Sequence, residues 1–450
     1  MGVSERLRAT TSRSRIAHVA MAALITFSAL TGVVHKHPCI QVQWDFGQVG
    51  KPISAIHDNT CYSDLPLLYR SALANGEIPF FDARRELPDG SLEYVEYPVL
   101  TGIVMYAVAS LTRAFGDQDD AAESVRFFYA NAVLFWLLAL VTGWSMLQVS
   151  PRGRPWDVLL FAVAPPLAYT STSNWDLLPV ALTGLALVAW QRERLLLAGG
   201  LVGLGCAAKL YPILVLVAVL VLGWRTGRRV EALRTSTAAV AVAALVNLPF
   251  ALLAPGWSYF FTMNSARGAD FGTIWLILVR HGIVFQQLNA ITLGAFCLGC
   301  LGIAVLGLRA STPPRLVQMI ALILIVFLLT NKVYSIQYAL WLIPIVVLAH
   351  PRPRHVLPWL AIELFLWQAT WNSMATDPGA AAGVWYEWAT VAHLVGLIWI
   401  AALVVRDVRR PDDDVVRRGF AEDLITRNPD GVFAVPTGAD SSSGTAGHQP

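Results

Sequence analysis

Apolar segments of about 15 to 22 residues recur along most of this 450-residue chain, and short polar links separate them. A helix of roughly 20 apolar residues has the length that crosses the hydrocarbon core of a bilayer. The composition agrees, because 56% of the residues are hydrophobic and only 14% are charged, against about 25% charged residues in soluble domains. The pattern predicts an all-α polytopic membrane protein. A net charge of +3 gives no argument for a nucleic-acid partner.

The distribution of basic residues predicts how the chain is oriented. Positive residues before the first apolar segment, 16–34, place the N-terminus in the cytoplasm. The sequence Val33-Val34-His35-Lys36 offers no small-x-small cleavage site, so we interpret this segment as an uncleaved span and not as a signal peptide. The loop 35–124 is then extracytoplasmic. The basic residues before the first segment are Arg6, Arg8, Arg13 and Arg15.

The apolar segment 97–115 is expected not to cross the membrane. If it crossed, the next span would deliver Arg152 and Arg154 to the outside, and every later basic link would be inverted. We expect instead a helix in the outer interface, or a re-entrant one. Both termini are then cytoplasmic, and the charged and Ser/Gly/Pro-rich tail 406–450 is expected to be disordered. The twelve predicted spans are 16–34, 125–148, 157–170, 175–190, 195–208, 210–224, 236–254, 289–308, 315–330, 334–349, 356–372 and 385–405.

The first extracytoplasmic loop contains one short amphipathic segment. Apolar residues at 65, 68, 69, 72 and 73 have helical spacing, and Gly76 and Pro79 end the pattern. This places Asp64 at the start of a helix that can lie along a membrane surface. The alternative is that Asp64 is an ordinary N-cap with Pro66 in the first turn.

The same loop holds Cys39 and Cys61, which can form a disulfide in an oxidising compartment. Its His35, His37 and His57, with Asp45 and Asp58, match no metal-ligand spacing, so we expect neither a metal site nor another cofactor. Asp45 and Asp58 compete with Asp64 as the functional carboxylate of this loop. They rank below it because no helix fixes their depth.

Two charged residues are expected below the outer surface of the membrane. Helices over 195–208 and 210–224 would rise only about 21 Å each, against a hydrocarbon core of about 30 Å. The turn at Lys209 is therefore recessed, and so is Asp176 near the start of 175–190. Charges at that depth favour a polar cavity that opens outward. The alternatives are that Lys209 extends to lipid headgroups and that Asp176 caps its helix.

Five short motifs, in this order, resemble those of the polytopic GT-C glycosyltransferases. Specifically, they resemble the bacterial mannosyltransferase-like family 87. The similarity extends over about residues 15–405, within an expected transmembrane domain 1–405, and departs at Ile336, where a proline is expected in many members. The motifs are Asp64-x4-Tyr69-x6-Gly76-x2-Pro79-Phe80, Glu96-Tyr97-Pro98-x-Leu100, Asn174-Trp175-Asp176, Lys209-Leu210-Tyr211-Pro212 and Lys332-x-Tyr334-x2-Gln337-Tyr338-x2-Trp341-x2-Pro344.

The resemblance implies a GT-C-like fold and a plasma-membrane enzyme with its active site outside. It implies inverting transfer of a sugar, mannose at the family level, from a polyprenyl-phosphate donor to a glycolipid or cell-envelope glycan. A first-loop aspartate would be the general base, and Asp64 suits that role. Lys209 is the first choice for binding the donor phosphate. Lys332 and Arg267 are second choices, unless they anchor to headgroups or are solvated loop charges.

Further candidate residues follow from the same motifs. Glu96 can orient sugar hydroxyls or assist Asp64, or it is a solvated loop carboxylate. Aromatic residues at span ends also serve as interfacial anchors, which is the alternative for the motif tyrosines and for the aromatic link 257–261. The remaining substrate-binding candidates are Asp176, Tyr69, Tyr97, Tyr334, Gln337 and Tyr338.

Three other functions remain open at this stage. An arabinofuranosyltransferase would share the fold. A transporter or flippase for polyprenyl-linked lipids fits the short helices, although no internal repeat is visible. A non-catalytic protein that binds isoprenoid lipids is the third. The sequence reveals neither the sugar nor the acceptor.

Overall fold

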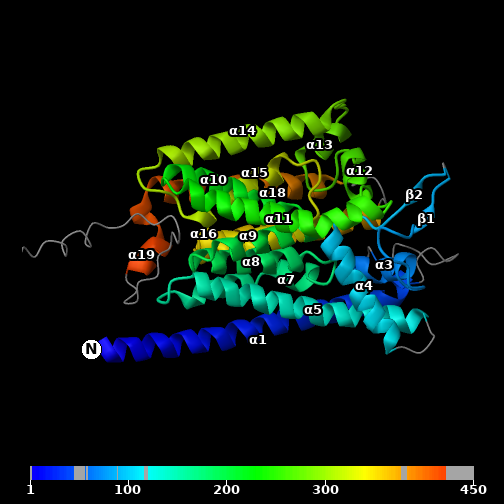
Figure 1. Cartoon of the computed structure of the whole chain (residues 1–450), viewed down its shortest axis with the longest axis horizontal. Helices are drawn as coiled ribbons and strands as arrows, with labels where there is room; N and C mark the ends of the chain where they lie inside the picture. Colours follow the sequence, from blue (N-terminus) through cyan, green and yellow to red (C-terminus); the bar gives the residue numbers. More distant parts are fainter. Residues whose placement is uncertain are drawn as a thin grey trace, which may run out of the picture.

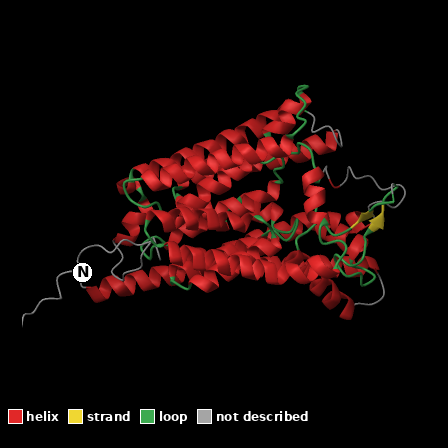
Figure 2. Ribbon diagram, turned by 45° about the horizontal axis from the view of Figure 1, so that its top comes forward, coloured by secondary structure: helices red, strands yellow, loops and turns green. Residues whose placement is uncertain are grey.

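The computed structural model describes residues 3–44, 56, 59–88, 90–115, 120–376 and 383–421. Helices make up nearly all of its regular structure, and one two-stranded hairpin lies at one end (Figure 2). Among the described residues, five helices are long and apolar enough to cross a membrane. They are α1 (Val3–Trp44), α5 (Asp120–Val149), α11 (Arg229–Leu253), α14 (Leu288–Arg309) and α18 (Val384–Arg409).

Shorter helices complete the bundle, and prolines interrupt several of them. The predicted span 157–170 is divided into η1, α6 and α7, because Pro165 and Pro166 occupy the first turn of the last piece. The other shorter elements of the bundle are η1 (Pro155–Val158), α6 (Leu159–Ala162), α7 (Pro165–Thr170), α8 (Leu177–Gln191), α9 (Leu195–Ala208), η2 (Tyr211–Ile213), α10 (Leu214–Arg225), α15 (Leu316–Thr330), η3 (Ile336–Tyr338), α16 (Ala339–Ala349) and α17 (Pro353–Thr376).

Every one of the twelve predicted spans coincides with one helix or with two or three short helical pieces, so the all-α polytopic class is confirmed. The long helices run side by side along the longest axis of the molecule (Figure 1). One end of this bundle carries the elements of the first loop and two short helices. These are α3 (Asp64–Ala72), β1 (Arg85–Glu86), β2 (Leu92–Glu93), α4 (Val99–Ala114), α12 (Tyr259–Ala266) and α13 (Ile274–Arg280).

The segment 97–115 stays at that end of the bundle. In the first turn of its helix α4, the Thr101 hydroxyl donates to the carbonyl of Ala208, at the end of α9. In the last turn of α4, Arg113 donates to the carbonyl of Leu73, just after α3. Both ends of α4 therefore contact the same end of the bundle, as a helix that does not cross would. Which side of the membrane this end faces remains a prediction.

Two glycines bring α9 against α11. A Cβ at Gly199 would collide with the carbonyl of Thr235, and one at Gly203 would collide with that of Ala239. Small residues four apart let two helices approach closely inside a membrane, where burial of apolar surface gives no driving force. This contact fixes α9, and with it the position of Lys209 at its end.

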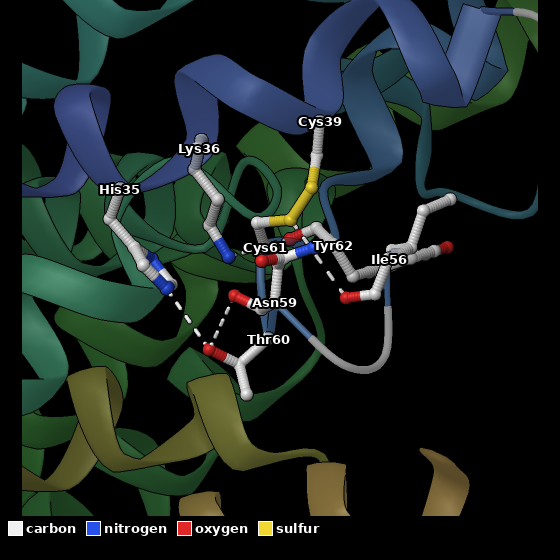
Figure 3. The surroundings of a disulfide bond; sticks show 8 residues. All are labelled: His35, Lys36, Cys39, Ile56, Asn59, Thr60, Cys61 and Tyr62. Carbon is white, nitrogen blue, oxygen red and sulfur yellow. Dashed lines mark hydrogen bonds between the residues drawn. A yellow bond between two sulfur atoms is a disulfide. The ribbon is translucent and has the colours of Figure 1, made fainter. Parts of the chain in front are cut away.

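The first span is longer than predicted, because α1 continues to Trp44. His35, Lys36 and Cys39 are therefore helical residues and not the start of a loop. Cys39 and Cys61, whose pairing the sequence leaves open, form a disulfide with Cα atoms 5.9 Å apart, which joins α1 to the residues before Asp64 (Figure 3).

The prediction of a disordered tail from residue 406 is wrong for its first part. The helix α18 continues to Arg409, and η4 (Pro411–Asp413) and α19 (Val415–Ala421) follow at the end opposite to α3 (Figure 1). Asp414 is buried and pairs with the buried Arg315, whose Nε lies 2.7 Å from Oδ2 of Asp414. A buried ion pair of this kind orders the segment. Residues 422–450 lie outside the described part of the chain.

Candidate functional site

A cavity of about 850 Å³ opens at the end of the bundle that carries α3 and α4. It collects most of the side chains that the sequence predicts as site residues, although they come from the first loop, from the turn after α9 and from the segments before α13 and α16. Those that line it are Asp64, Glu96, Tyr97, Lys209, Arg267, Lys332, Tyr334, Gln337 and Tyr338.

Asp64 is the first residue of α3 and not its cap. The N-cap is Ser63, whose hydroxyl oxygen accepts a hydrogen bond from the amide of Leu65. The carboxylate of Asp64 is therefore free to face the cavity, where the hydroxyl of Tyr97 donates to it at 2.5 Å. The alternative that Asp64 is an ordinary N-cap is thus wrong.

Burial sets the ionisation of Asp64. Removal from water raises the pKa of this carboxyl above its ordinary value, while the hydrogen bonds from Tyr97 and Tyr62 and the positive charge of Lys209 act in the opposite direction. The net direction is upward. Asp64 therefore binds a proton more readily than a solvated aspartate does, which suits a residue that takes up a proton during a reaction.

The apolar face of α3 packs against protein and not against a membrane surface. Leu65, Leu68 and Tyr69 are buried in the main core, and α3 contacts α1 and α5. The hydroxyl of Tyr69 donates to Oε2 of Glu123 at 2.6 Å, so Tyr69 does not lie among the described residues that line the cavity. Its prediction as a substrate-binding residue is not supported, because a core partner occupies its hydroxyl.

Lys209 and Asp176 form an ion pair beneath the cavity, with 2.8 Å between Nζ and Oδ1. The side chain of Asp176 is only 1% exposed and makes no capping hydrogen bond to α8. The ammonium also lies 5.3 Å from the ring centre of Tyr97 and 5.7 Å from that of Tyr338. Lys209 therefore does not extend to headgroups, and Asp176 does not act as a side-chain cap; both belong to the recessed site.

Stacked aromatic rings form the wall next to Lys209. The rings of Tyr338 and Trp341 lie 3.8 Å apart at 24°, and those of Trp341 and Tyr211 lie 4.6 Å apart at 11°. The 3-10 turn η3 begins at Ile336, so the turn forms without the proline that the family motif favours. These residues line the site and do not act as anchors at a membrane interface.

Lys332 holds other parts of the protein in place. Its ammonium donates to the carbonyl of Arg267 at 2.5 Å, to Oδ1 of Asn289 at 2.5 Å and to the carbonyl of Ser265 at 3.0 Å. An ammonium has three donors, and these three contacts use all of them. Lys332 therefore ties the end of α12 to the start of α14, which makes it a poor candidate for donor phosphate. Arg267 is 41% exposed at the cavity, with Nε 3.7 Å from Asp270.

Glu96 faces the same cavity as Asp64. Burial and the negative charge of Asp64 both raise the pKa of Glu96, and the positive charges of Arg84 and Arg267 oppose this. Two carboxylates that share a site favour holding one proton between them. Glu96 is therefore part of the site and not a solvated loop residue.

Sequence reasoning missed the partners behind Tyr334. Its hydroxyl donates to Oε2 of Glu363 at 2.9 Å, and Oε1 of Glu363 lies 2.7 Å from Nδ1 of His393. The available signal was that Glu363 is an acidic residue within the apolar segment 356–372, where a carboxylate needs a buried partner. Tyr62, which also lines the cavity, carried no such signal.

The two histidines near the end of α1 make ordinary hydrogen bonds. His35 Nε2 lies 3.0 Å from the Thr60 hydroxyl, and His37 Nδ1 lies 2.7 Å from the Tyr129 hydroxyl. Among the described residues there is no group of three or more His, Cys, Asp and Glu side chains that would hold a metal ion. His57, Asp45 and Asp58 lie outside the described residues.

Comparison with protein families gives one match. The model of glycosyltransferase family 87 matches residues 94–331, more than half of the chain. The matched region includes Glu96, Tyr97, Asp176, Lys209 and Arg267, and it begins after Asp64. No curated protein matches the chain. The chain therefore belongs to glycosyltransferase family 87, and the protein is a membrane glycosyltransferase.

Proposed function

We propose that the protein transfers a sugar, mannose as the first expectation, from a polyprenyl-phosphate donor to an extracytoplasmic acceptor by inverting displacement. One observation supports this above the others. A carboxylate, Asp64, and an ammonium, Lys209, line one cavity, and Tyr97 lies between them, with its hydroxyl on the carboxylate and its ring 5.3 Å from the ammonium.

In this reaction an acceptor hydroxyl oxygen attacks the anomeric carbon of the donor sugar. A new carbon–oxygen bond forms while the bond from that carbon to the phosphate oxygen breaks, and the phosphate leaves with the electron pair. Asp64 takes the proton of the acceptor hydroxyl. Because burial raises the pKa of Asp64, proton transfer to it is easier than to a solvated aspartate.

Lys209 stabilises the negative charge that develops on the leaving phosphate. A positive group fixed where charge develops gives the largest stabilisation when water is excluded. The pair with Asp176 holds the ammonium in place before the donor binds. Lys209 is a better candidate for this role than Lys332, whose three donors are already occupied.

The remaining polar wall suits a sugar. Glu96, Gln337 and Tyr338 face the same cavity and offer carboxylate, amide and hydroxyl groups to sugar hydroxyls. These groups can bind the hydroxyls of a hexose or of a pentose, so an arabinofuranose donor is the main competitor. The acceptor is expected to be a glycolipid or a cell-envelope glycan.

The test is transfer of a labelled sugar by the purified full chain. Polyprenyl-phosphate mannose and polyprenyl-phosphate arabinofuranose are each supplied with a membrane glycolipid extract. We expect transfer from one donor and a loss of roughly 10²- to 10⁴-fold in kcat for Asp64→Asn, the range for a lost general base. Asp412→Asn, an exposed aspartate on η4 at the opposite end, is the matched control and keeps full activity.

Two results would contradict the proposal. One is an Asp64→Asn variant that folds and transfers sugar at the wild-type rate. The other is a protein that moves polyprenyl-linked lipid across vesicles without forming a glycosidic product, which is the result expected of a flippase.

A further inference from the structure

The last turns of α1 contact three residues shortly before Asp64, namely Thr60, Cys61 and Tyr62. The His35 ring bonds the Thr60 hydroxyl, the Cys39 sulfur is bonded to Cys61, and the Lys36 ammonium donates to the carbonyl of Tyr62 at 2.7 Å (Figure 3). Thr60 has a φ of 55°, in the left-handed region that a β-branched residue seldom adopts. Contacts from α1 therefore keep this segment in a conformation that it would not adopt alone.

Lys36 is the unusual member of this group. It is only 1% exposed, and it is not among the described residues that line the cavity. A buried ammonium requires compensation, and a single carbonyl provides a dipole and no charge. Among the described residues, the carboxylate whose charge acts on Lys36 is Asp64. The sequence places Lys36 where a lysine ordinarily extends to headgroups, but here it points inward.

We propose that Lys36 is a positioning residue for Asp64. Its hydrogen bond holds the backbone carbonyl of Tyr62, two residues before Asp64. Its ammonium does not line the cavity, and it attracts the Asp64 carboxylate electrostatically. This inference rests on the proposed role of Asp64 as the base. It separates the two lysines, because Lys209 faces the substrate side of the site and Lys36 supports the carboxylate from α1.

Several other groups act on Asp64, and a test has to distinguish Lys36 from them. The backbone of Asp64 is held separately, since its amide donates to the carbonyl of Ser173 at 2.8 Å. Removing the Lys36 charge leaves that contact and the disulfide in place. Within the described part of the chain, the titratable groups that interact electrostatically with Asp64 are Tyr62 before α3, Glu96 and Tyr97 before α4, Asp176 at the start of α8, Lys209 after α9 and Lys36 on α1.

The test compares Lys36→Gln, Lys36→Met and Lys36→Arg with wild type. Glutamine keeps a donor for Tyr62 without the charge, methionine removes both, and arginine keeps the charge. For Lys36→Gln we expect the acidic limb of the pH profile of kcat/KM to move upward by about one pH unit, while KM for the donor stays unchanged. Lys36→Arg should restore the wild-type limb.

The matched control is the double variant Cys39→Ser with Cys61→Ser, which loosens the same segment and keeps the charge. Its acidic limb should not move, even where kcat falls. The inference is overturned if Lys36→Gln lowers kcat with an unmoved limb, or if the double serine variant moves the limb equally.

A second readout does not depend on transfer. Labelling of Asp64 by a water-soluble carbodiimide, followed by mass spectrometry across pH, reports when the carboxyl becomes protonated. The midpoint should be higher in Lys36→Gln than in wild type. A wild-type protein that transfers no sugar would refute the proposed function alone, and an equal labelling midpoint in the two proteins would refute the role of Lys36 alone.

Discussion

The Nζ atom of Lys209 lies 2.8 Å from Oδ1 of Asp176, and both atoms belong to side chains that helix packing recesses below one end of the bundle. A phosphate that enters the cavity shares this ammonium with Asp176. Fixing the lysine in this pair costs desolvation free energy, because the charges of a buried pair lose their hydration. Binding of an anion at Lys209 adds a second partner to a cation that the fold already keeps in place.

Replacement of Lys209 by methionine should abolish most transfer. We expect kcat to fall by roughly 10²- to 10³-fold, because one fixed stabiliser of the leaving group is lost, and KM for the donor to rise. Steady-state kinetics with labelled donor would measure both. Unchanged kinetics would contradict the role of Lys209.

The same variant leaves Asp176 buried without its cation, at a cost of about 3–5 kcal/mol. Lys209→Met combined with Asp176→Asn should therefore recover thermal stability in detergent without recovering transfer. A double variant that regains activity would show that the single variant fails only through unfolding.

The pH dependence of transfer should reflect Asp64. Burial raises the pKa of this carboxyl, and the base works only when it is deprotonated. Activity should therefore be lost as the pH falls through this raised pKa, at a higher pH than for a solvated aspartate. A profile of kcat/KM that stays flat down to the ordinary range of aspartate would contradict this.

The stability of the fold should change in the opposite sense. Because the pKa of Asp64 is raised on folding, its ionisation opposes folding once the pH exceeds its unfolded value. At neutral pH, Asp64→Asn should thus unfold at a temperature no lower than wild type does. Thermal unfolding at neutral pH, where the carboxylate is most ionised, would test this against Asp412→Asn.

Loss of Lys332 should affect binding more than chemistry. Lys332→Met breaks the link between the end of α12 and Asn289 on α14. The helix α12 contributes Phe260 and Met263 to the cavity wall. We expect a larger rise in KM than fall in kcat, which is the reverse of the pattern for Asp64→Asn. Asn289→Ala removes only one of the three acceptors and should have a smaller effect on the same measurement.

Removal of the disulfide should lower stability by about 3 kcal/mol, the value for a closed loop of this length; the two cysteines are 22 residues apart. Thermal unfolding of wild type with and without reductant, beside the double serine variant, would measure it. Equal stability of the oxidised and reduced protein would show that the loop is held by Lys36 and His35 alone.

The sequence predicted the residues of the site better than their individual contacts. Lys209 could be identified because a charge in an apolar context has few explanations other than a polar cavity. Asp64 could be identified because it begins the amphipathic segment of the first loop. The residue that caps α3 could not be predicted, because serine and aspartate are both good N-caps. Ser63 is the cap, while Asp64 accepts a hydrogen bond from Tyr97, more than 30 residues away in the sequence. Tyr69 was misplaced for a similar reason, since its partner Glu123 comes from another helix.

Long-range partners also explain the other differences. Nothing local distinguishes Lys332 as a tie between helices, because its acceptors are backbone carbonyls and one asparagine that the fold brings together. The charged tail after Arg409 had the composition of a disordered segment, and its order depends on long-range contacts, among them the buried pair of Asp414 with Arg315 and the burial of Val416 and Phe420. The family match, by contrast, agrees with the resemblance that short motifs had indicated.

The contact between Arg315 and Asp414 has a practical consequence for anyone who attaches a reporter to this protein. A fluorescent or affinity fusion joined directly after Arg409 would discard the anion that neutralises a guanidinium only 2% exposed, and the far end of the bundle would then carry an unmatched charge. One joined beyond Ala421 keeps that partner.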